Sequence, residues 1–167
     1  MRQTFSILVI CSLLACSTAE EARIPQDLVA VEILGFYPGD QGGISVVLKG
    51  REDIAVLIFI GDFEAQSLMM ALGKQITPRP LTYDLVQTLV NRLGTVKRLV
   101  IHSLQDNIFH AHLVVEDARR QIHKVDCRPS DGMNIATRMD VPIFLTPQVL
   151  EEAGIKLDGN QQTLEEI

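Results

Sequence analysis

The sequence is short of the features that mark many nucleic-acid-binding proteins. It has no Trp and only 5% aromatic residues, so it lacks the rings on which single-stranded nucleic acids stack. The 15 Lys and Arg residues are outnumbered by 21 Asp and Glu, which gives a formal net charge of −6. A basic phosphate-binding surface shows the opposite balance. Because 47% of the residues are apolar and 22% charged, the composition predicts an acidic globular domain instead of a disordered chain.

Long apolar runs are also missing, apart from one short run near the N-terminus. Met1-Arg2 is followed by a nearly uninterrupted apolar run over 5–15, which is shorter than the roughly 20 residues that span a bilayer. Its size and flanks are typical of a secretory signal peptide over 1–15. Leu13-Leu14-Ala15-Cys16 resembles the lipobox of bacterial lipoproteins, which implies lipidation of Cys16 and stable anchoring by two or three acyl chains. A plain signal peptide cut after Ala19 is the alternative.

Cysteine is too scarce for a disulfide framework. If Cys11 leaves with the signal peptide and Cys16 is lipidated, Cys127 is the remaining thiol, so the mature chain has no internal disulfide. Cys127 lies in an apolar-alternating run, which favours a buried structural thiol over a nucleophile. We therefore expect an exported, membrane-anchored lipoprotein on the periplasmic face or cell surface. A polar tether would cover 16–27, one domain 28–155, and a polar tail 156–167.

The order of elements predicts the fold class. Apolar alternation and turn residues predict strands over 28–34, 44–48, 55–60, 96–103, 108–116, 120–127 and 141–145. Helices are expected from Glu64, after the N-caps Thr82 and Ser130, and from Thr146-Pro147 to Gly154. This order predicts an α+β single domain with a mostly antiparallel sheet and helices packed against it.

Two strand–loop–helix units also echo one another. They place Glu64 and Asp131 at equivalent helix starts, although the preference of acids for the first helical turn explains both residues equally well.

Four segments carry the candidate chemistry: 60–65, 77–85, 126–138 and 141–145. In two of them an Arg-Pro pair, at Arg79 and at Arg128, precedes a helix start, an arrangement suited to binding phosphate. Hard oxygen ligands for Mg²⁺ or Mn²⁺ are available in the carboxylates of Glu64, Asp84, Asp126 and Asp131. The alternative is structural: Asp84 and Asp131 cap their helices, and Arg128 pairs with Asp126.

Together these segments resemble the bifunctional nuclease domain family, whose members are associated with DNase and RNase activity. The family patterns I-G-x-x-E-A, R-P-L-T-H-D-L, R-P-S-D-A-I-A-L-A-x-R and P-I-[FY]-V correspond to 60–65, 79–85, 128–138 and 142–145, the third of them loosely. The resemblance covers about 28–155. It implies metal-assisted hydrolysis of DNA or RNA, with Glu64, Asp84 and Asp131 as catalytic and metal-binding residues and Arg79, Arg128 and Tyr83 on the phosphate.

Two residues depart from the family pattern beside this candidate site. Tyr83 stands where the family usually has His, and an ordinary tyrosine pKa near 10 makes a poor base at neutral pH. Gly132 begins a Gly-Met-Asn segment in place of an Ala-rich helix start, at a cost of about 1 kcal/mol in helix preference. Both changes weaken the expectation of activity and leave the expected fold intact.

Two functional hypotheses follow. In the first, the domain is a metal-assisted phosphodiesterase acting on DNA or RNA outside the cytoplasm. In the second, it is a non-catalytic binding or assembly module on the same fold, tethered to a membrane through Cys16. The acidic net charge and the missing His favour the second hypothesis, whereas the family resemblance favours the first. Assembly as a homodimer is compatible with either.

The histidines and one basic cluster complete the set of candidate residues. His110 and His112 share one strand face, a spacing that can ligate zinc, but the apolar residues alternating with them favour an exposed polar face. His102 lies on the preceding strand, and the sequence leaves open whether the strand register places it beside His110 and His112. The basic cluster comprises Arg119, Arg120, His123 and Lys124. It is interpreted as a solvated hairpin tip or, alternatively, as a weak binding site for a polyanion.

Overall fold

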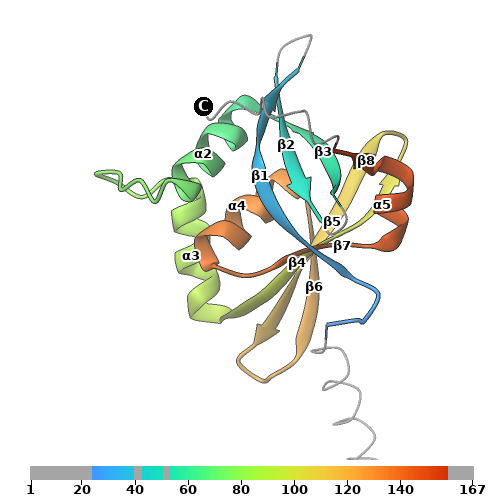
Figure 1. The fold of residues 1–167 in the computed structure, drawn as a ribbon. Coiled ribbons are helices and arrows are strands. Elements are labelled where there is room, and N and C mark those ends of the chain that lie inside the picture. The colour runs from blue at the N-terminus through green and yellow to red at the C-terminus, as the bar shows by residue number, and fades with distance from the viewer. Residues whose placement is uncertain (1–23, 40–42, 51–52, 158–167) are drawn as a thin grey trace, which may run out of the picture.

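A computed structural model describes residues 24–39, 43–50 and 53–157, which form one α+β unit (Figure 1). Its strands are β1 (Val29–Pro38), β2 (Ile44–Lys49), β3 (Ile54–Ile60), β4 (Gly94–Gln105), β5 (Ile108–Asp117), β6 (Ile122–Cys127), β7 (Ile143–Leu145) and β8 (Ile155–Lys156). Its helices are α2 (Asp62–Leu72), α3 (Thr82–Leu93), α4 (Pro129–Met139) and α5 (Pro147–Ala153).

The described strands form one 8-stranded sheet in the order β6-β5-β4-β7-β1-β2-β3-β8. Neighbouring strands are antiparallel, apart from the parallel pair β4 and β7. This arrangement confirms the α+β class with a mostly antiparallel sheet. The short β7 joins the N-terminal hairpin strands to the β4–β5–β6 meander, so segments far apart in the sequence share one sheet.

The helices cover the sheet unequally. In Figure 1, α2, α3 and α4 gather on one side of the molecule and α5 lies on the other. All but α3 contribute fully buried residues to one hydrophobic core, in which Leu68 of α2, Met133 of α4 and Val149 of α5 meet Leu99 of β4. Tyr83, Val86 and Val90 of α3 pack against this core from its margin. Hydrogen bonds from Arg128 to Glu64 and from Tyr83 to Asp131 bring the N-terminal ends of these three helices together just after the end of β6.

Two of the predicted N-caps are wrong. Helix α3 begins at Thr82 itself with Leu81 as the N-cap, and the Asp84 carboxylate accepts a hydrogen bond from the Leu81 N–H at 2.8 Å. Helix α4 begins at Pro129 with Arg128 as the N-cap, so Ser130 is its second residue and is buried. In α3 the first-turn acid Asp84 thus takes the place of the hydroxyl cap that the sequence suggested, whereas α4 has no side-chain cap and carries Asp131 in its first turn. Thr146, by contrast, does cap α5 through Val149 N–H.

Strand ends differ from the prediction by a few residues. β6 begins at Ile122, because Arg120 lies in the preceding turn with φ +65°. β7 begins at Ile143, two residues later than predicted. Ile155 and Lys156 pair with β3, so the C-terminal tail is ordered at its start. The predicted signal peptide, Cys16 and the tail from 158 onward lie outside the described residues. Across the described ranges, no helix combines the length and apolarity needed to cross a membrane.

Candidate functional site

A cleft of about 590 Å³ lies between α2 and α3. Its walls are largely apolar, with Phe63, Met70 and Val86 among the lining side chains. Its polar side is formed by Glu64, Tyr83, Arg128 and Asp131. Glu64, Arg128 and Asp131 come from the segments 60–65 and 126–138, and Tyr83 comes from 77–85. The fold therefore brings together three of the four segments that the sequence singled out.

Arg128 is the centre of this polar cluster. Its Nε donates to Asp131 Oδ2 at 2.7 Å and its Nη2 to Asp131 Oδ1 at 3.0 Å, a bidentate pair. The same Nη2 donates to Glu64 Oε1 at 2.8 Å. The Arg128 side chain is nevertheless 66% exposed. One accessible guanidinium thus joins two carboxylates that are 67 positions apart in sequence, and the pairing of Arg128 with Asp126 that the sequence left open is not the one observed.

Tyr83 closes the cluster from α3. Its hydroxyl donates to Asp131 Oδ1 at 2.6 Å. Burial, followed by this hydrogen bond to a carboxylate, raises the pKa of Tyr83 well above its ordinary value. Burial acts to raise the pKa of Asp131, but the hydrogen bonds from Arg128 and Tyr83 outweigh it and lower that pKa. Near neutral pH, Tyr83 is therefore a neutral hydrogen-bond donor and Asp131 is an anion.

Two equivalent strand–loop–helix units position the acids. β3 leads into α2, which begins at Asp62, and β6 leads into α4, which begins at Pro129. Glu64 and Asp131 are therefore the third residues of their helices, as the echo in the sequence suggested. The N-cap Gly61 leaves room for the Glu64 carboxylate, because a side chain at position 61 would run into Glu64 Oε2.

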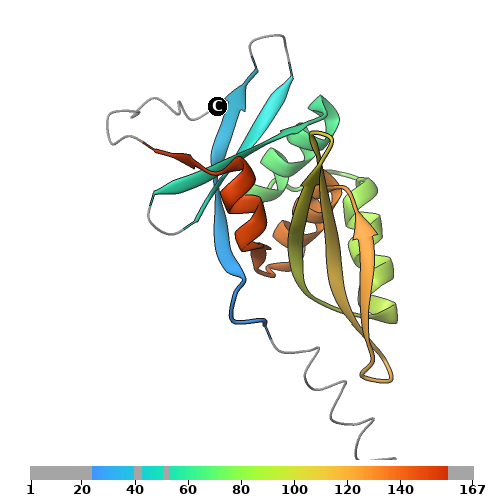
Figure 2. The same ribbon diagram turned by 90° about the vertical axis from the view of Figure 1, so that its right-hand side faces the viewer.

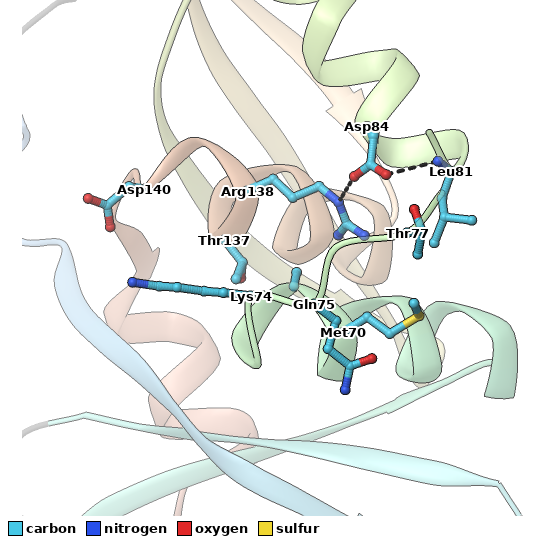
Figure 3. A pocket seen from close by; sticks show the side chains of 10 residues that line it. Met70, Lys74, Gln75, Thr77, Leu81, Asp84, Thr137, Arg138 and Asp140 are labelled. Atoms are coloured by element: carbon cyan, nitrogen blue, oxygen red, sulfur yellow. Dashed lines mark hydrogen bonds and ion pairs between the residues drawn. The ribbon is translucent and has the colours of Figure 1, made fainter. Parts of the chain in front are cut away.

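Asp84, the third predicted catalytic acid, belongs to a different network. Asp84 Oδ1 accepts from Arg138 Nε at 2.8 Å, and its other oxygen is held by the Leu81 N–H (Figure 3). These two hydrogen bonds lower the pKa of Asp84. Asp84 lines a second groove of about 440 Å³ that does not include Glu64 or Asp131 among its lining residues. Its observed contacts are those of a structural anion.

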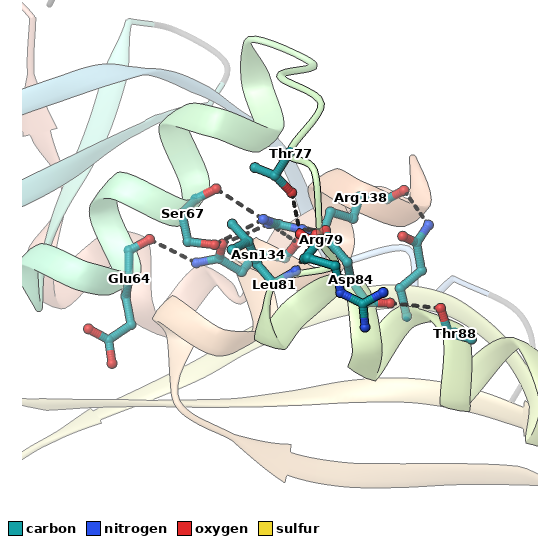
Figure 4. Close-up of polar contacts among 10 residues, drawn as sticks. Glu64, Ser67, Thr77, Arg79, Leu81, Asp84, Thr88, Asn134 and Arg138 are labelled. Carbon is teal, nitrogen blue, oxygen red and sulfur yellow. Dashed lines mark hydrogen bonds and ion pairs between the residues drawn. The ribbon is translucent and has the colours of Figure 1, made fainter.

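Arg138 is a buried residue that bonds several partners, a role that the sequence did not predict. Its side chain is 7% exposed, and Figure 4 shows it between Ser67, Asp84 and Asn134. Nη2 donates to Ser67 Oγ at 2.9 Å, and Nη1 donates to Asn134 Oδ1 at 2.9 Å. The fully buried Asn134 in turn donates to the Glu64 carbonyl at 3.0 Å. The four-residue spacing of Asn134 and Arg138 along α4 was the available signal, since residues so spaced share a helix face.

Arg79 is placed apart from Arg128. It lies exposed in the loop between α2 and α3, where its carbonyl accepts from Thr77 Oγ1 at 2.6 Å (Figure 4). It is not among the residues that line the cleft with Arg128. Asp126 likewise lies on β6, opposite His112 of β5. Of the six predicted site residues, the cleft therefore assembles Glu64, Tyr83, Arg128 and Asp131.

The carboxylates present do not form a metal site as they stand. No group of three or more His, Cys, Asp or Glu side chains within the described ranges is arranged to hold a metal ion. Glu64 and Asp131 share the Arg128 guanidinium, and Asp84 is paired with Arg138. A divalent ion would therefore have to displace Arg128 from both carboxylates before it could bind them.

The histidines are less exposed than predicted. His112 is half-buried, and its ring centroid lies 5.1 Å from that of His102. Burial lowers the pKa of His112 to about 4, so the ring is neutral near pH 7. Cys127 is half-buried beside Gly132, and burial raises the pKa of its thiol to about 11. That thiol is protonated and poorly nucleophilic, in agreement with the structural role expected for it.

Two members of the predicted basic cluster pair with acids at a hairpin tip. His123 Nε2 lies 2.9 Å from Asp117 Oδ2, and Arg120 lies 3.8 Å from Glu116. Both acids come from β5. These pairs agree with the interpretation as a solvated hairpin tip and offset part of the positive charge of the cluster.

Comparison with known proteins identifies the family. The model of the bifunctional nuclease domain matches residues 46–158. An uncharacterized protein of Mycobacterium tuberculosis is 40% identical over 113 residues, which cover 67% of this chain and 66% of that protein. Bifunctional nuclease 1 of Oryza sativa is 30% identical over 118 residues, covering 68% of this chain and 36% of the relative. For bifunctional nuclease 2 of Arabidopsis thaliana the identity is 29% over 128 residues, covering 74% of this chain and 39% of the relative.

The matched region thus spans just under two thirds of the mycobacterial protein and well under half of the plant proteins. Within this chain it contains the β3–α2 and β6–α4 units and therefore the whole Glu64–Arg128–Asp131 cluster. The chain belongs to the bifunctional nuclease domain family.

Proposed function

We propose that the domain cleaves phosphodiester bonds of DNA or RNA in the cleft between α2 and α3. The observation that carries the proposal is the Arg128 guanidinium, which is 66% exposed and lies within 2.8 Å of both the Glu64 and Asp131 carboxylates. An exposed arginine is suited to binding a phosphate, and an adjacent carboxylate is suited to accepting a proton from the group that attacks the phosphate. The names of the plant relatives support the choice of a nucleic acid as substrate.

The residues of the cleft have distinct roles in this proposal. The incoming phosphate takes over the Arg128 Nη2 hydrogen bond that Glu64 now accepts, while Asp131 keeps the hydrogen bond from Arg128 Nε. Glu64, released from Arg128, accepts a proton from the attacking water or RNA 2′-hydroxyl as the new P–O bond forms. The departing ester oxygen takes a proton from solvent as the original P–O bond breaks. Tyr83 holds Asp131 in place through its 2.6 Å hydrogen bond, so that Asp131 keeps the guanidinium oriented. The cleft mouth beside Phe63 receives the neighbouring base or sugar.

The divalent ion expected from the sequence, Mg²⁺ or Mn²⁺, stays a prediction. Glu64 and Asp131 are the two acids near enough to share it, and Asp84 would first have to leave Arg138. No step of the proposed chemistry is therefore assigned to a metal. Dependence of cleavage on Mg²⁺ or Mn²⁺, and its loss in EDTA, measures whether a divalent ion takes part in cleavage.

A second function, binding without catalysis, is favoured by one observation. Each acid of the predicted catalytic set already has an arginine partner: Glu64 and Asp131 have Arg128, and Asp84 has Arg138. Carboxylates paired in this way act as structural anions unless a ligand separates them. On this alternative the cleft binds a phosphorylated or nucleic-acid ligand without cleaving it.

The cellular setting is part of the proposal. Export by the signal peptide and lipidation at Cys16 would place the domain on a membrane surface outside the cytoplasm. The test is acyl labelling of the full chain in a bacterial host, with Cys16→Ser as the variant and Cys11→Ser as its matched control. Labelling that persists in Cys16→Ser would contradict lipid anchoring at that residue.

A cleavage assay tests the enzymatic proposal. The full chain is incubated with supercoiled DNA and with single-stranded RNA, each in Mg²⁺, Mn²⁺ or EDTA. Arg128→Ala and Asp131→Asn are expected to reduce cleavage by about a hundredfold or more, with the fold checked by circular dichroism. Asp117→Asn is the matched control, because Asp117 is also a hydrogen-bonded acid but lies in the β5–β6 hairpin. Absence of cleavage by the folded wild-type chain would favour the binding module.

A further inference from the structure

A further hollow, of about 410 Å³, adjoins the cleft at Arg128, which alone among the described residues lines both. It is formed by the start of β2, the end of β3, the tip of the β4–β5 hairpin and the first turn of α4. In Figure 2 the tip of that hairpin lies next to the end of β3. We call it the Phe59 hollow; the residues that matter here are Ser45, Phe59, Asn107, Arg128 and Ser130. A ligand held by the Arg128 guanidinium can therefore extend into the cleft, into this hollow, or into both.

The two most exposed aromatic side chains of the described residues lie in these two spaces. Phe63, 86% exposed, lines the cleft, and Phe59, 66% exposed, lines the Phe59 hollow. The Phe59 ring lies against the backbone of Gly43, which has φ +87° and where an added side chain would run into the ring. The ring is thus held in place while most of it stays accessible. Although aromatic residues are scarce in this sequence, the fold puts one accessible ring in each space that Arg128 borders, where a base can stack on it.

Polar side chains with unused hydrogen-bonding capacity also line the Phe59 hollow. Ser45 lies opposite Phe59 in the β2–β3 register, and Asn107 is exposed in the hairpin turn with φ +63°. Ser130 is 6% exposed, and only its carbonyl is bonded, by Asn134. Within the described part of the chain, no group hydrogen-bonds the Ser130 hydroxyl or the Asn107 amide. Because an unpaired polar group in a buried side chain costs free energy, these groups favour a ligand that offers both donors and acceptors.

We propose that the Phe59 hollow binds a nucleobase next to the phosphate that Arg128 holds. The base stacks on Phe59, and its edge exchanges hydrogen bonds with Asn107 and Ser130. A nucleobase fits this lining because it combines a flat face that stacks with an edge of donors and acceptors, and a sugar links it to a phosphate. The inference rests on the proposed function for the phosphate at Arg128, and it applies equally to binding without cleavage.

The position of Arg128 between the two spaces constrains the bound strand. With one base on Phe59 and the next beside Phe63, the two bases that flank the phosphate lie in different spaces and do not stack on one another. Hydrogen bonds from Asn107 and Ser130 to a base edge also compete with base pairing. The subsite therefore takes an unpaired segment, whose bases are free to turn apart and stack on protein rings.

Binding of a dinucleotide to the full 167-residue chain tests the subsite independently of cleavage. A dinucleotide has one phosphodiester, so one register places that group on Arg128. Its dissociation constant is measured by calorimetry in EDTA, at fixed salt and detergent concentrations, beside those of two analogues that each lack one of the two bases. The wild type should bind the dinucleotide about tenfold or more tightly than the analogue that lacks the base bound at Phe59, since stacking on an aromatic ring contributes about that much per base.

Phe59→Ala identifies that base. It should weaken the dinucleotide and one analogue about tenfold, and leave unchanged the other analogue, whose missing base is the one that Phe59 binds. Ile76→Ala is the matched control, because Ile76 is 97% exposed and lines neither space; it should change none of the three affinities. Circular dichroism establishes that both variants fold. An equal loss for all three ligands, no loss, or no binding by the wild type overturns the subsite.

Asn107→Gly tests the contact with the base edge. Glycine adopts the positive φ of this turn and removes the amide, so the differences in affinity among dinucleotides with different bases should shrink severalfold. Asp106→Gly is the control, since Asp106 has φ +50° in the same turn and does not line the hollow. Base-dependent binding without cleavage would support the subsite and contradict the nuclease function. Cleavage by a chain whose dinucleotide binding ignores Phe59→Ala would overturn the subsite and leave the nuclease function standing.

Discussion

Asp84 accepts a hydrogen bond from Arg138 at 2.8 Å, and this pair ties the first turn of α3 to the last turn of α4. Arg138 also bonds Ser67 of α2, so one buried guanidinium holds all three helices that surround the cleft. The pair therefore holds the helices beside the cleft together, although neither of its residues lines the cleft.

Replacing Arg138 should destabilise the domain. Arg138→Met is expected to lower the free energy of unfolding by about 2–4 kcal/mol, because it leaves Asp84, Ser67 and Asn134 without a shared partner. Asp84→Asn should cost only about 1 kcal/mol, since its carboxylate is partly exposed, and should retain most of any nuclease activity. Urea titration and the cleavage assay measure the two effects. Loss of activity in a fully folded Asp84→Asn variant would instead assign Asp84 a catalytic role.

Tyr83 limits the chemistry of the cleft. Its hydroxyl stays protonated because burial and Asp131 raise its pKa, whereas a histidine at this position would titrate near neutral pH. Tyr83→His should therefore increase the rate of cleavage by about tenfold or more, with a pH profile that shows a new group titrating between about pH 6 and 7. The readout is the rate on RNA and DNA across pH 5–9.

Tyr83→Phe is the matched control for this substitution. It keeps the ring and its stacking beside Arg138, whose guanidinium carbon lies 5.4 Å from the ring centroid, but removes the hydrogen bond to Asp131. The rate should not rise. If Tyr83→His is as slow as the wild type while remaining folded, the difference from the family pattern is not what limits activity.

The sequence predicted the elements better than it predicted their contacts. Strand positions follow from the alternation of apolar and polar residues, which is a local property of the sequence. These positions were right to within a few residues. The N-caps were wrong at Thr82 and Ser130, because a carboxylate three residues into α3 and a proline at the start of α4 shift each helix start. Hydroxyl residues at such positions carry no signal that separates a cap from the first helical turn.

The candidate site was predictable only in part, for the same physical reason. Arg79 and Arg128 each stand before a proline near a helix start. Only Arg128 follows a strand, and its side chain bonds acids in the first turns of α2 and α4. Whether Glu64, Asp84 and Asp131 meet depends on tertiary packing, which places Asp84 against Arg138 instead. No local sequence pattern shows which arginine pairs with which acid, because the competing partners come from separate segments.

Gly132 is explained by packing. A Cβ at this position would run into Leu99 Cδ1 and would come within 3.2 Å of Cys127 Sγ, and Leu99 is fully buried. Gly132→Ala should therefore lower the free energy of unfolding by about 1–2 kcal/mol, although alanine is favoured over glycine in a helix by about 1 kcal/mol. Gly35→Ala is the control, since nothing lies within 4 Å of its added methyl group. A stabilised Gly132→Ala variant in urea titration would mean that Leu99 moves aside at little cost.

The half-buried His112 predicts how stability depends on pH. Its pKa is about 4 in the folded chain against 6.5 for the free side chain, because burial, His102, Lys124 and Arg98 outweigh the attraction of Asp126. Between these two values the unfolded chain binds a proton that the folded chain does not. The free energy of unfolding should therefore fall as the pH is lowered from about 6.5 to about 4.5, by on the order of 1–2 kcal/mol after allowing for partial exposure.

His112→Gln should flatten this decline, because glutamine binds no proton in either state. Urea titrations at pH 7.0 and pH 4.5 measure it, and both values lie above the range in which Asp84 and Asp131, with lowered pKa values, begin to lose their charge. His110→Gln removes a histidine from the same sheet face while leaving His112 in place, so it should keep most of the wild-type slope. An unchanged slope in His112→Gln would show that the proton is taken up elsewhere in the unfolded chain.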